Sequence, residues 1–97
     1  MIKYIRDREL EKKIIDYLVA RGAKKIEFFG SYVRGGDYND IDIIVEFDKK
    51  ISLLDFLGFQ LDLEDITGKK IDLLTMDSIS KYIYPFIEKE KDVVYER

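Results

Sequence analysis

The sequence contains neither cysteine nor histidine. Without cysteine there can be no disulfide bond, no thiolate metal ligand and no cysteine nucleophile. Without histidine, no Ser-His-Asp or Cys-His arrangement and no imidazole metal site is available. Any chemistry of this chain must therefore use carboxylates, lysines, arginines, hydroxyls and backbone groups. A metal ion held by such oxygen ligands is expected to be a hard cation, Mg²⁺ or Mn²⁺.

Long apolar runs and a basic surface are lacking as well. The apolar runs are far shorter than the ~20 residues of a membrane-spanning helix. Residues 1–11 are charged throughout, unlike a secretory signal. We therefore expect a cytoplasmic protein without membrane contact. The net charge of −3 argues against direct nucleic-acid binding, which requires a basic face. With 46% hydrophobic and 38% charged residues, the chain is expected to be globular, with one domain over residues 1–97.

The order of apolar residues predicts helices and strands in alternation. Leu10, Ile14 and Leu18 form one helical face, with Asp7 as a candidate N-cap and Gly22 as a stop. Alternating or β-branched segments predict three main strands, at 25–29, 40–47 and 70–75, and a short closing strand at 92–95. Further helical segments are predicted at 31–34, from the Ser52 cap to about 66, and from 77 or 78, where Pro85 should interrupt or restart the helix. This order, αβαβαβα, predicts an α/β (α+β) fold with a small mixed sheet flanked by helices.

Three aspartates at strand positions are candidate metal ligands. Asp40 and Asp42 are two residues apart on a strand, so both project to the same face. Such a pair can hold two cations about 3.5–4 Å apart, the spacing of two-metal phosphoryl transfer. A solvated strand edge is the alternative for the pair alone, because Asp-x-Asp is a common pattern. Asp72 has the same setting on strand 70–75, where a strand-end charge beside Lys69 and Lys70 is the alternative. If the two strands are neighbours, the three carboxylates converge.

Gly30-Ser31 is a candidate phosphate site. A strand that ends in Gly-Ser and runs into a helix leaves unpaired backbone N–H groups directed outward, where a phosphate binds with help from the helix dipole. Glycine lets the phosphate approach the backbone, and the Ser31 hydroxyl adds one donor. An ordinary turn is the alternative for this dipeptide. Arg34, one helical turn further on, can reach a phosphate oxygen or pair with a carboxylate.

Together these motifs resemble the minimal nucleotidyltransferases of the DNA polymerase β superfamily. The resemblance lies in Phe29-Gly30-Ser31 through Gly35, Asn39-Asp40-Ile41-Asp42 through Val45, and Lys70-Ile71-Asp72 through Leu74. It implies a polymerase β palm-like fold, ATP as substrate and two Mg²⁺ ions as cofactors. It further implies that Gly30, Ser31 and Arg34 bind the nucleotide and that Asp40, Asp42 and Asp72 are catalytic and bind the metals. Two departures are the eight-residue spacer between Ser31 and Asp40, a residue or two shorter than usual, and Asn39 where Ser is common.

As a small member of this superfamily, the chain resembles the antitoxin half of HEPN/MNT toxin–antitoxin pairs. The resemblance implies a HEPN ribonuclease toxin as partner and AMP transfer to a toxin tyrosine. A small-molecule transferase of the kanamycin-modifying type, or an antitoxin that acts by binding alone, remains an alternative.

The sequence also offers two candidate docking surfaces for such a partner. The first is the aromatic and aliphatic cluster of residues 82–87, which packing on the chain's own sheet would equally explain. The second is formed by Phe56 and Phe59 on the helix that Ser52 caps.

Overall fold

The structure is a computed structural model that describes residues 7–34, 40–79, 81–82 and 84–97. Its elements follow in the order α1 (Arg8–Val19), β1 (Ala23–Phe29), α2 (Ser31–Arg34), β2 (Asp40–Phe47), α3 (Leu53–Thr67), β3 (Lys70–Leu74), the 3-10 turn η1 (Met76–Ser78), α4 (Tyr84–Glu90) and β4 (Asp92–Glu96). The predicted alternation is confirmed, and so is the short closing strand, which is β4. Of the residues singled out above, Gly35, Asn39 and Ile83 lie outside the described ones.

Local signals set the ends of most elements. The Asp7 carboxylate accepts a hydrogen bond from the Leu10 N–H (3.1 Å), and the Ser52 hydroxyl accepts one from the Asp55 N–H (3.1 Å). Both predicted N-caps are therefore confirmed. Gly68 ends α3 in the left-handed conformation, with φ +70°.

Two predicted boundaries were wrong. β1 begins at Ala23 instead of Lys25, because Ala23 is fully buried and pairs with Phe47 of β2. Alanine has no strong strand preference, so the sequence does not reveal this pairing. The last helix begins at Tyr84 instead of residue 77 or 78, where η1 forms a single turn. Pro85 then stands in the first turn of α4, the only part of a helix that tolerates proline.

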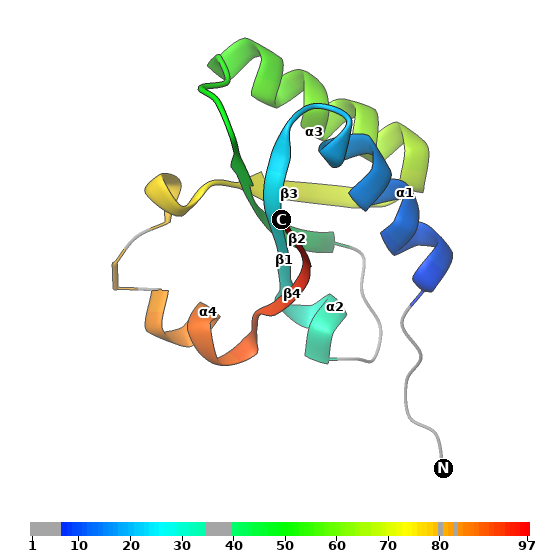
Figure 1. Cartoon of the computed structure of the whole chain (residues 1–97). Helices are drawn as coiled ribbons and strands as arrows, with labels where there is room; N and C mark the ends of the chain where they lie inside the picture. Colours follow the sequence, from blue (N-terminus) through cyan, green and yellow to red (C-terminus); the bar gives the residue numbers. More distant parts are fainter. Residues whose placement is uncertain (1–6, 35–39, 80, 83) are drawn as a thin grey trace.

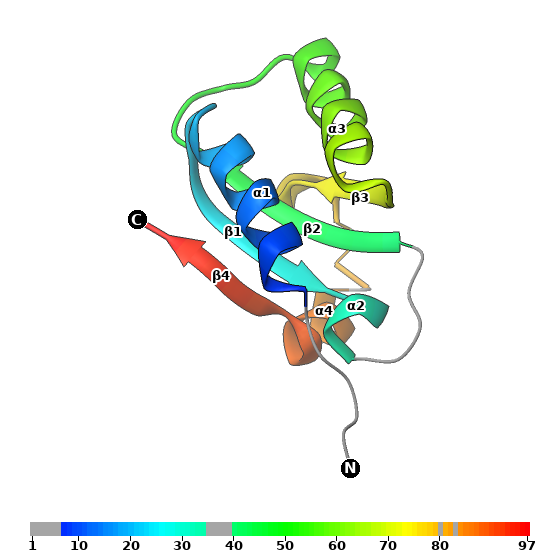
Figure 2. The same cartoon turned by 90° about the vertical axis from the view of Figure 1, so that its right-hand side faces the viewer.

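The four strands form one mixed sheet in the order β3-β2-β1-β4. β1 runs antiparallel to both β2 and β4, whereas β2 and β3 are parallel. Parallel neighbours need a crossover connection, and α3 supplies it. Helices α1 and α3 cover one face of the sheet and α4 lies on the other (Figures 1 and 2). Nowhere in the described ranges does a helix have the length and apolar content needed to cross a membrane.

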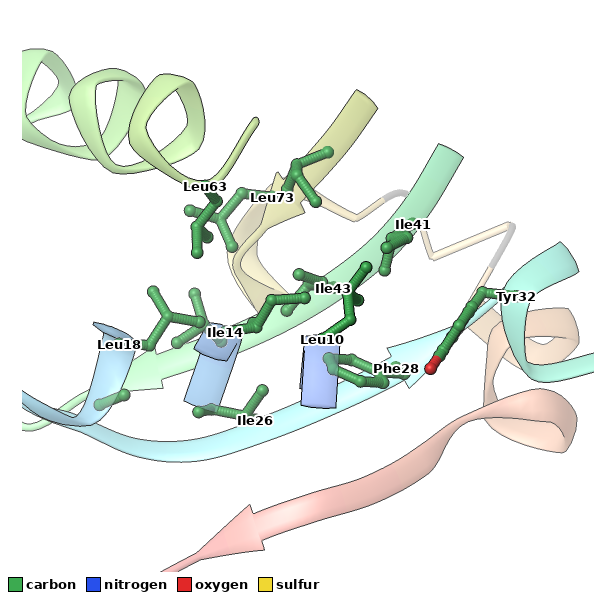
Figure 3. Packing of buried hydrophobic residues seen from close by; sticks show 13 residues of the cluster. Leu10, Ile14, Leu18, Ile26, Phe28, Tyr32, Ile41, Ile43, Leu63 and Leu73 are labelled. Carbon is green, nitrogen blue, oxygen red and sulfur yellow. The ribbon is translucent and has the colours of Figure 1, made fainter. Parts of the chain in front are cut away.

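The main core lies between the sheet and α1 and α3 (Figure 3). Alternate strand residues such as Ile26, Phe28, Ile41 and Ile43 point into it, in keeping with the period of two in a strand. A smaller cluster of Phe29, Ile44 and Ile87 occupies the opposite face, under α4. The intervening positions of β2 and β3 on that second face are Asp40, Asp42 and Asp72, so the sheet separates the main core from the carboxylates.

Two side chains of α3 occupy the outer edge of the sheet. Gln60 Oε1 accepts a hydrogen bond from the Leu73 N–H (3.2 Å), and Glu64 Oε2 accepts one from the Ile71 N–H (3.1 Å). These bonds satisfy alternate N–H groups of β3, which is an edge strand and would otherwise present them to another chain. They also hold in place the strand that carries Asp72.

Candidate active site

Register brings two of the predicted carboxylates together. Asp42 of β2 pairs directly with Asp72 of β3, and on its other side Asp42 pairs with Phe29 of β1. Neighbouring strands lie about 4.8 Å apart, so the Asp42 and Asp72 side chains stand next to each other on one face. Asp40 pairs with Lys70, two residues further out on the same face as Asp42. The prediction that the second and third strands are neighbours is confirmed.

Gly30 lies against Asp42. Its φ of +82° falls in the left-handed region, and an added Cβ atom would stand 2.2 Å from Asp42 Oδ2. Real Cβ contacts are essentially never that short, so any other residue here would have to displace the Asp42 carboxylate in addition to adopting a strained left-handed backbone. Gly30 and Asp42, one residue from each of the two predicted motifs, are therefore directly adjacent.

The Asp42 carboxyl carries the clearest electrostatic signature of the site. Burial is the largest cause that raises the pKa of Asp42, from 3.8 to about 6, followed by a hydrogen bond to Asp72 and the charges of Asp72 and Asp40. The positive charge of Arg34 acts in the opposite direction, which places Arg34 within electrostatic reach of the carboxylates. Excess negative charge at this point favours the binding of a cation.

A buried hydrogen bond positions α2 beside the carboxylates. The Tyr32 ring packs edge-on against Phe28, with ring centroids 5.7 Å apart, and its hydroxyl donates to Glu11 Oε2 (2.5 Å). Tyr32 and Glu11 are both buried, so α1 anchors the helix that begins at Ser31. The sequence reasoning missed this pair. Glu11 directly follows Leu10 on the buried side of α1. A carboxylate next to the apolar face of a predicted helix is the sequence signal that could have indicated a buried partner for Glu11.

A cleft of about 420 Å³ opens next to the carboxylates. Asp42 and Asp72 stand among its lining residues with Gln60 and Ser78, and the remaining walls are apolar: Phe29, Leu73, Leu74, Ile79 and Ile87. Ile87 comes from α4, so this helix closes the cleft from the side opposite the sheet. A space of this size can take part of a nucleotide or an acceptor side chain.

The site residues have the right chemistry for a divalent cation, but their carboxylates are not arranged around one common point. Three carboxylates on one sheet face provide the hard oxygen ligands that Mg²⁺ prefers. Over the described ranges, however, no three acidic side chains are gathered closely enough to hold a metal ion. Asp42 and Asp72 are hydrogen-bonded to each other, and the charge of Asp40 also acts on Asp42.

Comparison with known proteins identifies the family. Residues 12–97 match the family described as polymerase beta, nucleotidyltransferase. The chain therefore belongs to the polymerase β nucleotidyltransferases, as its sheet order and the Asp42–Asp72 pair beside Gly30 indicate.

Within this family the chain is similar to protein adenylyltransferases. It is 44% identical to a candidate protein adenylyltransferase of Methanocaldococcus jannaschii over 73 residues, which cover 73% of this chain and 78% of the relative. It is 38% identical to the protein adenylyltransferase MntA of Thermococcus cleftensis over 76 residues, covering 76% of this chain and 75% of the relative.

A solved structure shares the fold. One chain in the solved complex of the tri-AMPylated Shewanella oneidensis HEPN toxin with MNT antitoxin matches this chain with a TM-score of 0.76 at 22% identity, covering 93% of this chain and 72% of the matched one.

Proposed function

We propose that this chain transfers AMP from ATP to a tyrosine of a HEPN ribonuclease toxin and thereby acts as its antitoxin. The observation that carries the proposal is the direct pairing of Asp42 with Asp72 beside Gly30. The relatives named protein adenylyltransferase support a protein acceptor, and the tri-AMPylated toxin of the similar complex supports a HEPN partner. Because ATP is a cytoplasmic nucleotide, the proposed reaction assigns the protein to the cytoplasm.

The triphosphate would bind at the end of β1. Gly30 lets its oxygens approach the backbone, and the Ser31 hydroxyl donates a hydrogen bond to them. Arg34, whose charge already acts on Asp42, can donate to the β- and γ-phosphates and so stabilise pyrophosphate as it leaves.

The carboxylates would hold Mg²⁺. Asp40 and Asp42 project from one face of β2 and Asp72 from the same face of β3, so all three would contribute oxygen ligands if a bound cation drew their side chains together. Bound there, Mg²⁺ supplies charge neutralisation of the triphosphate and a lower pKa of the attacking hydroxyl. The raised pKa of Asp42 supports this assignment, since a cation would remove its cause.

The chain's own residues would then move one proton. The acceptor hydroxyl gives its proton to the Asp72 carboxylate, while its oxygen bonds to the α-phosphorus of ATP. The bond between that phosphorus and the bridging oxygen breaks, and pyrophosphate departs. The products are an AMP-tyrosine phosphodiester and pyrophosphate.

Intact-mass spectrometry tests the proposal. The chain is co-expressed with a HEPN protein from its own genome, and the mass of the toxin is measured and the modified residue is mapped. We expect AMP on a toxin tyrosine with the native chain and with Asp77→Asn, an exposed acid of η1, but not with Asp72→Asn.

Each other outcome selects a different function. A toxin that is neutralised yet carries no AMP would indicate an antitoxin that acts by binding alone. A toxin that is neither bound nor modified would favour the small-molecule transferase.

A further inference from the structure

The cleft beside the carboxylates extends away from α2. β1 runs toward α2, whereas β2 and β3 run in the opposite direction (Figure 2). The cleft begins at Asp42 of β2 and Asp72 of β3, follows β3 to Leu74 and continues to η1. Among the described residues, none of those in α2 lines it. The carboxylates therefore lie between the start of α2 on one side and the cleft on the other.

The proposed reaction determines what approaches the carboxylates from each side. Its triphosphate binds at Gly30 and Ser31, so pyrophosphate leaves toward α2. In phosphoryl transfer, the attacking oxygen and the leaving oxygen stand roughly in line on opposite sides of the phosphorus. With the α-phosphorus at the carboxylates, the attacking hydroxyl has to come from the side of the cleft.

The walls of the cleft suit an aromatic side chain. Phe29, Leu74, Ile79 and Ile87 make most of its surface apolar, and the Asp72 carboxylate stands at one end. A phenol combines an apolar ring with a single hydroxyl, so its ring can cover these walls while its hydroxyl meets the carboxylate. A serine or threonine side chain would leave the walls exposed to water, which costs free energy.

Gln60 supplies the cleft with one oriented hydrogen-bond donor. Its Oε1 accepts a hydrogen bond from the Leu73 N–H (3.2 Å), and because an N–H group can only donate, this bond fixes the orientation of the amide. The Nε2 group is left for another partner, and the described part of the chain provides none. The Ser78 hydroxyl, by contrast, already donates to the Thr75 carbonyl (2.8 Å) and accepts from the Thr75 N–H (3.2 Å).

We propose that the cleft is the acceptor subsite, which takes the phenol ring of the acceptor tyrosine, and that Gln60 positions this phenol by donating a hydrogen bond from Nε2 to its oxygen. The phenolic O–H is then directed at Asp72, which takes the proton, and the oxygen keeps a lone pair for the phosphorus. This inference rests on the proposed function and adds to it a subsite and a positioning residue.

Methyl NMR spectroscopy of the isolated chain tests the subsite without any reaction. The probe is N-acetyltyrosinamide, added to the chain in the presence of Mg²⁺ and the ATP analogue AMP-PNP. We expect the probe to shift the methyl resonances of Ile79 and Ile87, which line the cleft, and to leave that of Ile66 at the far end of α3 unchanged. If AMP-PNP instead prevents the probe from binding, the cleft holds the nucleoside and the proposal is overturned.

Two substitutions on the same strand edge separate the positioning role of Gln60 from its structural role. Gln60→Met and Glu64→Met each remove one hydrogen bond to an N–H of β3, but only Gln60 lines the cleft. The native chain should bind N-acetyltyrosinamide more tightly than N-acetylphenylalaninamide. Gln60→Met should reduce this ratio of affinities by about three- to tenfold, the contribution of one hydrogen bond, and Glu64→Met should preserve it. An unchanged ratio in Gln60→Met would remove the positioning role.

Failure of the subsite is distinguishable from failure of the transferase assignment. Both binding measurements use the isolated chain, whereas AMP transfer is read from the mass of the toxin. If the toxin receives AMP in a reaction that depends on Asp72 and the tyrosine probe leaves the Ile79 and Ile87 resonances unchanged, the acceptor enters elsewhere. That result overturns the subsite and leaves the transferase function standing.

Discussion

At the scale of single residues, the candidate site depends on one glycine as much as on its carboxylates. Gly30 gives the chain a backbone conformation that other residues adopt only with strain, and its missing side chain makes room for Asp42 Oδ2. Gly68 shares the first property without the second, because its φ is +70° and a Cβ atom there would meet nothing within 4 Å. A substitution at Gly68 would therefore cause backbone strain alone, whereas the same substitution at Gly30 would add a steric conflict with Asp42.

Substituting each glycine by alanine should distinguish these effects. Both Gly30→Ala and Gly68→Ala should lower the free energy of unfolding by about 1–2 kcal/mol through left-handed strain. Only Gly30→Ala also displaces Asp42, so it should reduce AMP transfer by about 100-fold or more, whereas Gly68→Ala should retain transfer. Urea denaturation and a transfer assay on the toxin measure the two quantities. Unimpaired transfer by Gly30→Ala would show that the Asp42 position is not required.

At the scale of elements, a buried ion pair attaches the last helix to the sheet. Lys91, directly after α4, places its Nζ 2.9 Å from Oε2 of Glu27, a β1 residue that is 1% exposed. The Glu27 carboxylate is the main cause that raises the pKa of Lys91, with Glu88 contributing in the same direction. Ile87 of the same helix lines the cleft, so this ion pair also holds a wall of the candidate site.

Removing one partner of this ion pair should cost much more than removing both. Lys91→Met leaves Glu27 buried, with Lys25 at 3.9 Å as its remaining cation among the described residues, and should lower the free energy of unfolding by about 3 kcal/mol. Combining it with Glu27→Leu removes the uncompensated charge and should restore most of that loss. Lys89→Met, on the exposed side of α4, should change stability by less than about 0.5 kcal/mol. Equal losses in Lys91→Met and Lys89→Met would exclude a structural role for the pair.

Within the 82–87 segment, some of the described residues are exposed and others are buried. Tyr82 is 81% exposed and Phe86 71%, whereas Ile87 is buried under the sheet. The described part of this segment thus contains a core residue as well as exposed aromatic residues, and docking of a partner on the exposed ones stays a prediction.

At the scale of the whole molecule, the crowded carboxylates link stability to pH and to metal. The pKa of Asp42 is about 6 in the folded chain against 3.8 for an ordinary aspartate. Between these values the folded state binds more protons than the unfolded state, so this group's contribution to stability is present at low pH and lost as the pH rises through about 6. The lowered pKa values of Asp48 and Glu88 give the opposite trend, since their contribution appears as the pH rises.

A comparison with Asp42→Asn isolates the effect of this one carboxylate. Without metal at pH 7.5, Asp42→Asn should be more stable than the native chain by about 1 kcal/mol, an amount reduced by solvent screening of a half-exposed group. At pH 4.5 the difference should shrink. Mg-ATP should raise the melting temperature of the native chain and leave the variant unchanged. Urea denaturation with EDTA at both pH values and thermal melts with Mg-ATP provide the measurements. A variant less stable than the native chain at pH 7.5 would contradict the electrostatic account.

Much of the fold could be predicted because the relevant signals are local. The periods of two and 3.6 and the caps at Asp7 and Ser52 depend on residues within a few positions of one another. The common face of Asp40 and Asp42 follows from strand geometry alone. The start of β1 at Ala23 could not be predicted, because its pairing with Phe47 depends on a residue far along the chain.

The amino-acid sequence by itself determined which chemistry is open to this protein: with no cysteine or histidine, only carboxylates, hydroxyls, cationic side chains and the backbone are available. The tertiary structure alone decided which of these groups meet. Asp42 and Asp72 are thirty residues apart, and their pairing requires the α3 crossover and the parallel register that it allows. It also decided which side of α3 is buried, because this helix is apolar on both sides. Local periodicity cannot choose between two apolar faces, whereas packing against Phe47 and the β3 edge can.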